Sequence, residues 1–131
     1  MNARVSETAP LAGLSILLLE DEFLIALDAE EILTALGAAQ VEVVNTLDAA
    51  RDALENSYDL ALLDINVNGE MSFPVAEQFV AGKVPVVFAS GYEMRTPPKL
   101  NGVTVPCVSK PYTREDLKSV VVAALAAHRA Q

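Results

Sequence analysis

The sequence predicts an α/β domain in which five parallel strands form one sheet and helices cover both of its faces. Five short apolar runs alternate with stretches in which apolar residues recur at helical spacing. The runs are nearly continuous rather than alternating, as expected for strands buried on both faces by βαβ crossovers. With 131 residues, 52% of them hydrophobic and 21% charged, the chain suits one domain with a real core and is not intrinsically disordered.

The composition of the chain argues against several classes of binding partner. A net charge of −9 argues against nucleic acid and against anionic membrane surfaces, because both attract clustered Lys and Arg. No apolar run approaches the ~20 residues of a membrane span. The single Cys107 excludes an internal disulfide framework and a Cys-based zinc site. We expect a small cytoplasmic domain over residues 14–131, preceded by a flexible leader over residues 1–13.

Strand order follows from which runs are polar. Gln40 and Glu42 mark the second run as one edge of the sheet, and Pro106, inside the fifth run, marks the other edge because it lacks a ladder donor. This pattern fits the flavodoxin-like order 2-1-3-4-5. The five predicted strands are Ser15–Leu19, Val41–Val44, Leu60–Leu63 (ending on Asp64), Val84–Ala89 and Thr104–Val108.

Helices are predicted between these strands, with one exception. Residues 92–102 contain Pro97-Pro98 and little apolar stripe, so we predict a loop or one ragged turn there, and a fourth helix that is short or absent. The other helices are predicted over Glu22–Leu36, from the cap Thr46 to about Glu55, from Pro74 to about Val80, and from the cap Thr113 through Leu125.

Polar residues follow four of the predicted strands. Glu20 and Asp21 follow the first, Asp64 the third, Ser90 the fourth and Lys110 the fifth. Carboxyl ends of parallel strands meet at one edge of the sheet, where ligands bind. Clustered carboxylates repel one another unless a cation lies among them, and oxygen ligands with open positions suit Mg²⁺. A carboxylate beside bound Mg²⁺ can attack phosphorus and form an aspartyl-phosphate.

Four short motifs carry a family resemblance. They are Leu-Leu-Leu-Glu20-Asp21-Glu22, Leu-Leu-Asp64-Ile-Asn66, Ala89-Ser90-Gly91 and Ser109-Lys110-Pro111, each at a predicted strand end. In this order they make the chain similar to the receiver domain of two-component response regulators, from about Leu14 to Arg129, which implies a (βα)5 fold. The run Phe88-Ala89-Ser90-Gly91-Tyr92 resembles the single-domain FAT GUY (Phe-Ala-Thr/Ser-Gly-Tyr) subfamily.

The resemblance implies a role for each matching residue. Asp64 would be the phosphoryl acceptor, Ser90 the switch hydroxyl and Lys110 the lysine that pairs with the phosphoryl group. The implied cofactor is Mg²⁺, and the Lys110–Pro111 bond is expected to be cis. The implied metal ligands are Glu20, Asp21, Asp64 and the backbone carbonyl of Asn66.

The sequence departs from the family pattern in its expected output surface. Most receivers have Tyr or Phe three positions before the lysine, where this chain has Cys107. Because Cys107 has no ring to rotate and the fourth helix is poor, we expect the switch to lie in the loop from Gly91 to Gly102. Tyr92 either screens the phosphoryl group or packs within that loop.

The implied function is that of a stand-alone response regulator. It would accept phosphate from a sensor histidine kinase and either bind a downstream protein or act as a phosphate sink. Its only catalysis would be Mg²⁺-dependent self-phosphorylation and dephosphorylation. We expect a monomer or weak dimer with no nucleic acid partner, no membrane insertion and no further output domain after Gln131.

Two other classes of protein share parts of this pattern. Haloacid-dehalogenase-like phosphohydrolases have a second acid two residues after the nucleophile, where this chain has Asn66. A pseudo-receiver, an interaction module that does not depend on phosphorylation, stays as the alternative, although the sequence retains every acid, hydroxyl and lysine of the motif.

Overall fold

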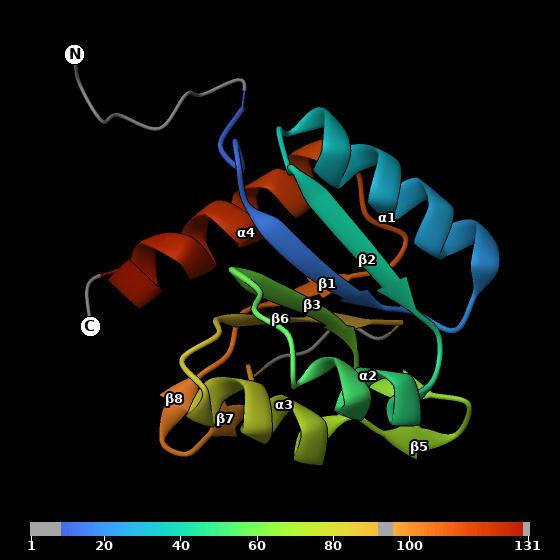
Figure 1. The fold of residues 1–131 in the computed structure, drawn as a ribbon. Helices are drawn as coiled ribbons and strands as arrows, with labels where there is room; N and C mark the ends of the chain where they lie inside the picture. The colour runs from blue at the N-terminus through green and yellow to red at the C-terminus, as the bar shows by residue number, and fades with distance from the viewer. Residues whose placement is uncertain (1–8, 92–95, 130–131) are drawn as a thin grey trace.

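The computed structural model describes residues 9–91 and 96–129 (Figure 1). Its central feature is a five-stranded parallel sheet in the order β2-β1-β3-β6-β9. This order confirms the predicted flavodoxin-like arrangement. The strands of this sheet are β1 (Ser15–Leu19), β2 (Gln40–Val44), β3 (Leu60–Asp64), β6 (Val86–Ser90) and β9 (Cys107–Ser109).

Within residues 9–91 and 96–129, four helices cover the sheet, two on each face. α1 and α4 lie against one face, and α2 and α3 lie against the other (Figure 1). In the described part of the chain, no helix is both long and apolar enough to cross a membrane. The helices are α1 (Phe23–Ala35), α2 (Leu47–Ala53), α3 (Phe73–Ala81) and α4 (Arg114–Arg129).

The strand sequences explain why two cores form. Successive side chains of a strand point to opposite faces of the sheet. In β1, Ile16 and Leu18 pack against α1 and α4, whereas Leu17 and Leu19 pack against α2 and α3. Every residue of β3 and β6 is buried, so these central strands read as continuous apolar runs in the sequence.

Two short hairpins were not predicted. The first joins β4 (Asn66–Val67) to β5 (Glu70–Met71), and the second joins β7 (Lys99–Leu100) to β8 (Val103–Thr104). Each turns through an Asn-Gly pair: φ is 52° at Asn68 and 88° at Gly69, and 52° and 80° at the equivalent Asn101-Gly102 pair. Positive φ at both central residues is the signature of a type I′ turn, which Asn-Gly favours.

The β7–β8 hairpin occupies the place where a fourth crossover helix was considered. Leu100, just before its turn, and Val105, just after β8, are buried in the same core as Phe79 of α3. No helix forms among residues 96–106, as the two prolines and the missing apolar stripe predicted. The remainder of that interval, 92–95, includes Tyr92 and lies outside the described residues.

The fifth strand is shorter than predicted. It begins at Cys107, because Thr104 is used by the hairpin strand β8. Pro106 therefore precedes the strand rather than lying inside it, although its carbonyl still accepts from the Phe88 N–H at 2.9 Å. The fourth strand likewise begins at Val86, two residues later than predicted.

Part of the predicted leader belongs to the packed domain. Leu11 is fully buried against the α1–α4 side of the sheet, and its N–H donates to the Leu36 carbonyl at 3.0 Å. The predicted leader included Leu11, whereas the structure packs this side chain into the core. A single leucine near Ala and Gly has no helical or strand periodicity, so this packing could not be predicted from the sequence. Residues 1–8 lie outside the described part of the chain.

Candidate functional site

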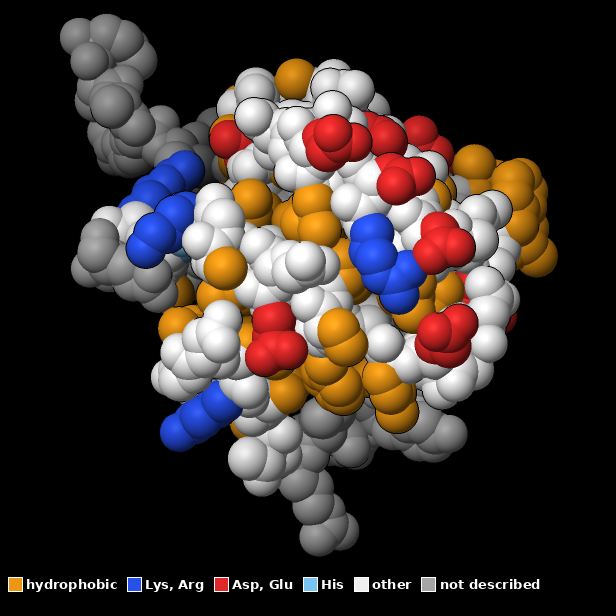
Figure 2. All heavy atoms as spheres, turned by 60° about the horizontal axis from the view of Figure 1, so that its bottom comes forward, with side chains coloured by type: hydrophobic (Ala, Val, Ile, Leu, Met, Phe, Trp, Pro, Cys, Tyr) orange, Lys and Arg blue, Asp and Glu red, His pale blue; other side chains and the backbone are white. Residues whose placement is uncertain are grey.

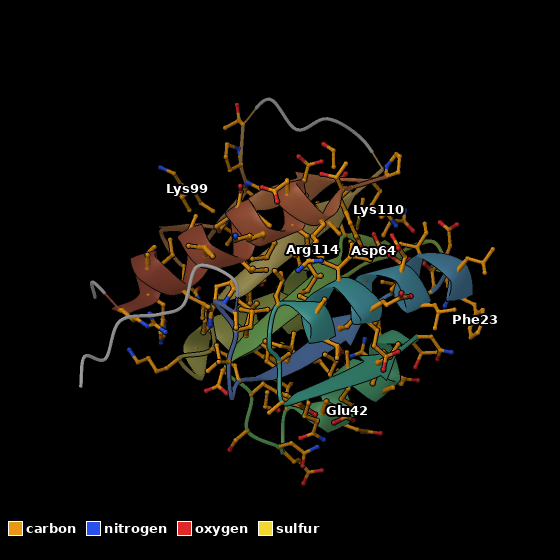
Figure 3. All side chains as sticks on the ribbon, turned by 90° about the horizontal axis from the view of Figure 1, so that it is seen from above. Phe23, Glu42, Asp64, Lys99, Lys110 and Arg114 are labelled. Atoms are coloured by element: carbon orange, nitrogen blue, oxygen red, sulfur yellow. The ribbon has the colours of Figure 1, made fainter. Side chains whose placement is uncertain are left out.

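The carboxyl end of the sheet brings together residues from three different strands. Lys110, which follows β9, extends its ammonium to Asp64 at the end of β3, with 3.1 Å between Nζ and Oδ2 (Figure 3). The same ammonium donates to both oxygens of Glu20, after β1, at 3.2 and 3.4 Å. Glu20 and Asp64 are only 2% and 4% exposed. One buried ammonium therefore bridges two buried carboxylates.

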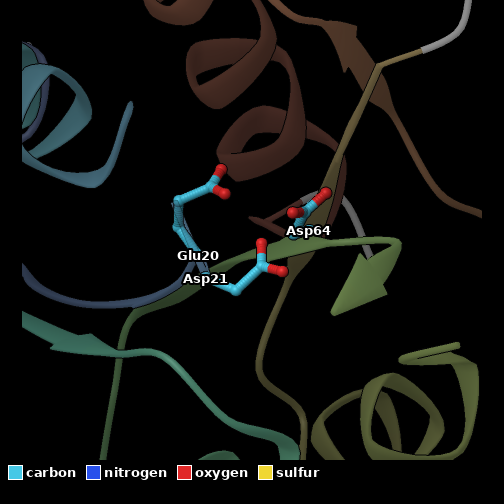
Figure 4. Close-up of side chains that lie close together, drawn as sticks. All are labelled: Glu20, Asp21 and Asp64. Carbon is cyan, nitrogen blue, oxygen red and sulfur yellow. The ribbon is translucent and has the colours of Figure 1, made fainter. Parts of the chain in front are cut away.

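Asp21 adds a third carboxylate to this edge. Oxygens of Glu20, Asp21 and Asp64 all lie within 4.8 Å of one another (Figure 4). The backbone N–H of Asn68 donates to Asp21 Oδ2 at 2.9 Å, so the β4–β5 hairpin holds this side chain in place. The hairpin is braced in turn by Asn66, whose side-chain oxygen accepts from the Gly69 N–H at 2.9 Å.

The pKa values of these groups reflect crowding of negative charge. Burial raises the pKa of Glu20 to about 7, and the nearby Asp64 charge adds to the rise. Burial also raises the pKa of Asp64, against the opposing effect of Lys110. For Lys110 burial acts downward, but the hydrogen bond and charge of Asp64, with those of Glu20, leave its pKa raised. One ammonium thus compensates three carboxylates only in part.

Asp21 behaves differently from the other two acids. Its limited burial acts to raise the pKa, but hydrogen bonds from backbone N–H groups, first that of Asn68, outweigh this and lower it. Asp21 therefore stays ionised beside Glu20 and Asp64. A carboxylate whose pKa is lowered, next to two that Lys110 compensates only in part, makes the cluster attractive to a cation.

The loop after Asp64 is fixed by a buried hydroxyl. Ser72, fully buried, donates from Oγ to the Asp64 carbonyl at 2.6 Å, and its N–H donates to the Ile65 carbonyl at 2.8 Å. These bonds tie the start of α3 to the end of β3. Asn66, two residues after Asp64, is exposed at the mouth of the site, and the predicted use of its carbonyl as a ligand stays a prediction.

Ser90 and Lys110 are joined through the backbone. Ser90 ends β6, is 5% exposed, and accepts from the Lys110 N–H through its carbonyl at 2.7 Å. The Lys110–Pro111 bond is cis, as predicted. Cys107 is half-buried and packs against the α2–α3 core, and burial raises the pKa of its thiol. The side chain of Cys107 therefore acts as part of the core on this face of the sheet.

Three contributors were missed by reasoning from the sequence. Asn68 acts through a backbone N–H, and its Asn-Gly pair was a usable hairpin signal. Ser72 acts through a hydroxyl whose direction depends on the fold. Tyr112 is 7% exposed, and its buried hydroxyl has no hydrogen-bond partner among the described residues. Burial raises the pKa of Tyr112, and the charges of Glu20, Asp28 and Asp64 add to the rise.

The donor set fits a hard divalent cation. Carboxylate oxygens are the ligands that Mg²⁺ takes from proteins, usually one or two at a time with waters completing the octahedron. Here three carboxylates converge, one with a lowered pKa and two with raised pKa values. A cation would relieve their mutual repulsion.

Comparison with known proteins assigns the family. No family model and no curated protein matches the chain. Among solved structures, it matches the N-terminal domain of a response regulator/sensory box/GGDEF 3-domain protein from Carboxydothermus hydrogenoformans at 30% identity and a TM-score of 0.76, covering 88% of this chain and 97% of that one. The chain belongs to the response regulator receiver domains. This receiver also matches SdrG from Sphingomonas melonis Fr1 at 35% identity and a TM-score of 0.68, over 87% of this chain and 97% of that one.

Other receiver relatives are longer or more distant. The response regulator PhyR from Brucella abortus matches at 24% identity and a TM-score of 0.73 over 92% of this chain, which spans only 51% of PhyR. The receiver domain of sensor histidine kinase PA1611 from Pseudomonas aeruginosa PAO1, described with a magnesium ion coordinated in its active site cleft, matches at 21% identity, a TM-score of 0.73 and coverages of 88% and 99%. At these identities the likeness shows the fold alone.

Proposed function

We propose that this receiver accepts a phosphoryl group on Asp64 from a phosphohistidine of a sensor histidine kinase, in the cytoplasm. The observation that carries the proposal is the bridge from Lys110 to both Asp64 and Glu20, with Asp21 beside them. The hydrogen bond and charge of Lys110 favour the ionised form of the Asp64 carboxylate, against the burial that raises its pKa. An ionised, poorly compensated carboxylate is a competent nucleophile.

Transfer of the phosphoryl group forms one bond and breaks one bond, and it needs no further reactant. An Asp64 carboxylate oxygen forms a bond to phosphorus as the phosphorus–nitrogen bond of the phosphohistidine breaks, and the nitrogen leaves with the electron pair. Lys110, already 3.1 Å from Asp64, pairs with a phosphoryl oxygen, which leaves Glu20 with one donor fewer. The Ser90 hydroxyl is buried on the neighbouring strand and would donate a hydrogen bond to a second phosphoryl oxygen.

Mg²⁺ is the proposed cofactor, held by Glu20, Asp21, Asp64 and the Asn66 carbonyl. When bound, it would neutralise charge on the transferring phosphoryl oxygens. Asp21 is held for this task by the Asn68 N–H. The hairpin that supplies this N–H also carries Asn66, so one turn would set two of the four ligands.

Output is proposed to be protein binding or competition for kinase phosphate, as in the stand-alone FAT GUY receivers that Phe88 to Tyr92 resembles. The segment that leads away from Ser90 supports this proposal. Ser90 ends β6, and the next described element along the chain is the β7–β8 hairpin, which packs against α3, so the proposed output surface is this hairpin rather than a helix.

Intact-mass measurement with acetyl phosphate tests the proposal. With Mg²⁺ the wild type should gain one phosphoryl mass, whereas Asp64→Asn should gain none and chelation of the metal should abolish the gain. Asp52→Asn, which removes an exposed carboxylate of α2, is the matched control and should label like the wild type. Unlabelled wild type under all Mg²⁺ conditions would favour a pseudo-receiver, and equal labelling of Asp64→Asn would assign the phosphate elsewhere.

A further inference from the structure

A hollow lies at the amino end of the sheet, opposite the carboxylate cluster. It has a volume of about 290 Å³ and lies between the end of α3, the β7–β8 hairpin and the last turns of α4. Its walls are mainly apolar, with Val80, Val86, Val105 and Ala124 among the lining side chains. This volume is at the small end of the range for ligand pockets, which are typically apolar with a few polar groups at set points.

The polar groups at this hollow are cationic or neutral. Lys83 and His128 line it, and none of its lining residues is acidic. An adjoining hollow shares Lys83 and His128 and adds Arg129, together with Asp59, whose carboxylate accepts from the Ser15 N–H at 2.8 Å. Among the described residues the ion pairs involve only Arg51 and Lys110 as cations. Lys83 and Arg129 are therefore without an acidic partner there, in a chain of net charge −9.

The surface view agrees with this separation of charge. In Figure 2, Lys and Arg side chains gather toward the left of the face shown, and most Asp and Glu side chains lie along its top and right. A cationic region on an otherwise acidic surface attracts anions while the rest of the molecule repels them.

Lys83 is held in a backbone conformation that a lysine disfavours. Its φ is +68°, in the left-handed region that glycine adopts freely at helix ends. Hydrogen bonds on either side fix the turn: the Lys83 N–H donates to the Val80 carbonyl at 3.0 Å, and the Val84 N–H donates to the Phe79 carbonyl at 2.9 Å. Glycine would fit this position better, and strain retained at a cationic side chain is typical of functional sites.

We propose that this hollow binds a small carboxylate with an apolar body. The apolar part would lie against Val80, Val86 and Val105, and the carboxylate would meet Lys83 and His128 at the rim. A neutral ligand would form no ion pair with the basic side chains, and a fully polar anion would bury no apolar surface against the walls. Asn101 and Thr104 of the hairpin also line the hollow, so an occupant would contact the segment that follows Ser90. Binding here does not depend on phosphorylation of Asp64.

Nuclear magnetic resonance titration of the whole chain with hexanoate tests the proposal. At constant ionic strength, hexanoate should produce saturable backbone shifts in residues 80–86 and 103–106 and in the last turns of α4. Hexanamide, the neutral isostere, and inorganic phosphate should bind about tenfold more weakly or not at all, the usual scale for losing one charged or one apolar contact.

Variants separate a binding role from a structural one. Lys83→Gly should raise the melting temperature, because glycine relieves the positive φ, yet weaken hexanoate binding about fivefold or more. Lys99 is an exposed lysine of the β7–β8 hairpin that does not line the hollow. The control substitution Lys99→Gln should therefore leave hexanoate binding unchanged. Equal binding of hexanamide, equal binding of phosphate, undiminished binding by Lys83→Gly, or no saturable shift with hexanoate would each overturn the proposal.

Discussion

At the carboxyl end of the sheet Lys110 lies buried between Glu20 and Asp64, whereas at the amino end Lys83 borders an apolar hollow without an acidic partner among the described residues. The difference follows from the chain direction. In a parallel sheet the loops that leave the strands converge at the carboxyl end, so acids placed after β1 and β3 must share one space. The amino end receives chain arriving from helices and the β7–β8 hairpin, and its walls are apolar.

Removal of a cation should therefore destabilise the carboxyl end much more than the amino end. A buried ammonium with two carboxylate partners holds the structure together, and its loss leaves charge stranded in a buried site. A cation at a solvent-accessible rim contributes little to folding. Variants at the two ends can therefore be compared as matched pairs.

The largest expected effect is that of Lys110→Met. Removal of the ammonium leaves Glu20 and Asp64 buried without their counter-charge, which should lower the free energy of unfolding by about 2–4 kcal/mol at neutral pH without metal. Lys83→Met, at the other end, should change it by less than about 0.5 kcal/mol. Urea unfolding measures both. Similar losses for the two variants would contradict the difference between the ends.

The next effect is a dependence of stability on pH at the carboxyl end. Glu20 has its pKa raised from 4.5 to about 7 in the folded protein. Between these values the folded state holds a proton that the unfolded state has lost, so metal-free stability should fall as the pH rises through this window, by roughly 1–3 kcal/mol. Urea unfolding in chelator from pH 5 to 8 tests this. Glu20→Gln should flatten the dependence, and a wild-type profile that rises over this range would contradict it.

Magnesium should act in the same place with a smaller effect. An ion among the three carboxylates stabilises only the folded state, by about 1.4 kcal/mol at ten times its dissociation constant, or roughly 5 °C in melting temperature. Asp21→Asn should shift far less than the wild type, and Asp52→Asn should shift like the wild type. An unchanged wild-type melting temperature across a wide Mg²⁺ titration would count against the site.

The smallest expected effect is the difference between substitutions at two buried tyrosines, one near each end of the sheet. At the amino end Tyr58 donates its hydroxyl hydrogen bond to Glu42 and accepts one from Asn56, so Tyr58→Phe should destabilise the fold by about 1 kcal/mol. The Tyr112 hydroxyl, near the carboxyl end, has no partner among the described residues. Tyr112→Phe should be neutral or slightly stabilising in thermal unfolding, and a loss as large as that of Tyr58→Phe would show that its hydroxyl is bonded.

Much of the carboxyl end could be predicted from the sequence. Most of the strands are apolar runs with a polar residue at or just beyond their carboxyl ends, so Glu20, Asp64, Ser90 and Lys110 could be assigned to one edge before their distances were known. The bridge made by Lys110 could not be predicted, because a flexible side chain chooses its partners only in the folded site. The hydrogen bond from the Asn68 backbone N–H to Asp21 could not be predicted from the sequence either.

The amino end was much less predictable. The Asn101-Gly102 pair there is a strong hairpin signal, as is the Asn68-Gly69 pair at the carboxyl end, yet the two-residue strands that flank each pair carry too little periodicity to stand out beside the main runs. Once the second hairpin took Thr104, the predicted fifth strand had to shorten. The positive φ of Lys83 was also not predicted, because glycine, as in the neighbouring Gly82, is the residue type that usually adopts this conformation at the end of a helix.

Localisation of the phosphoryl group tests the central proposal most directly. After treatment with acetyl phosphate and Mg²⁺, borohydride reduces an acyl phosphate to an alcohol, which marks the acceptor residue permanently. Peptide mass analysis of the wild type should then find the reduced side chain at Asp64, and only when Mg²⁺ was present. A reduced side chain at Glu20 or Asp21, or none at all in protein that binds Mg²⁺, would contradict the assignment of Asp64 as the phosphoryl acceptor.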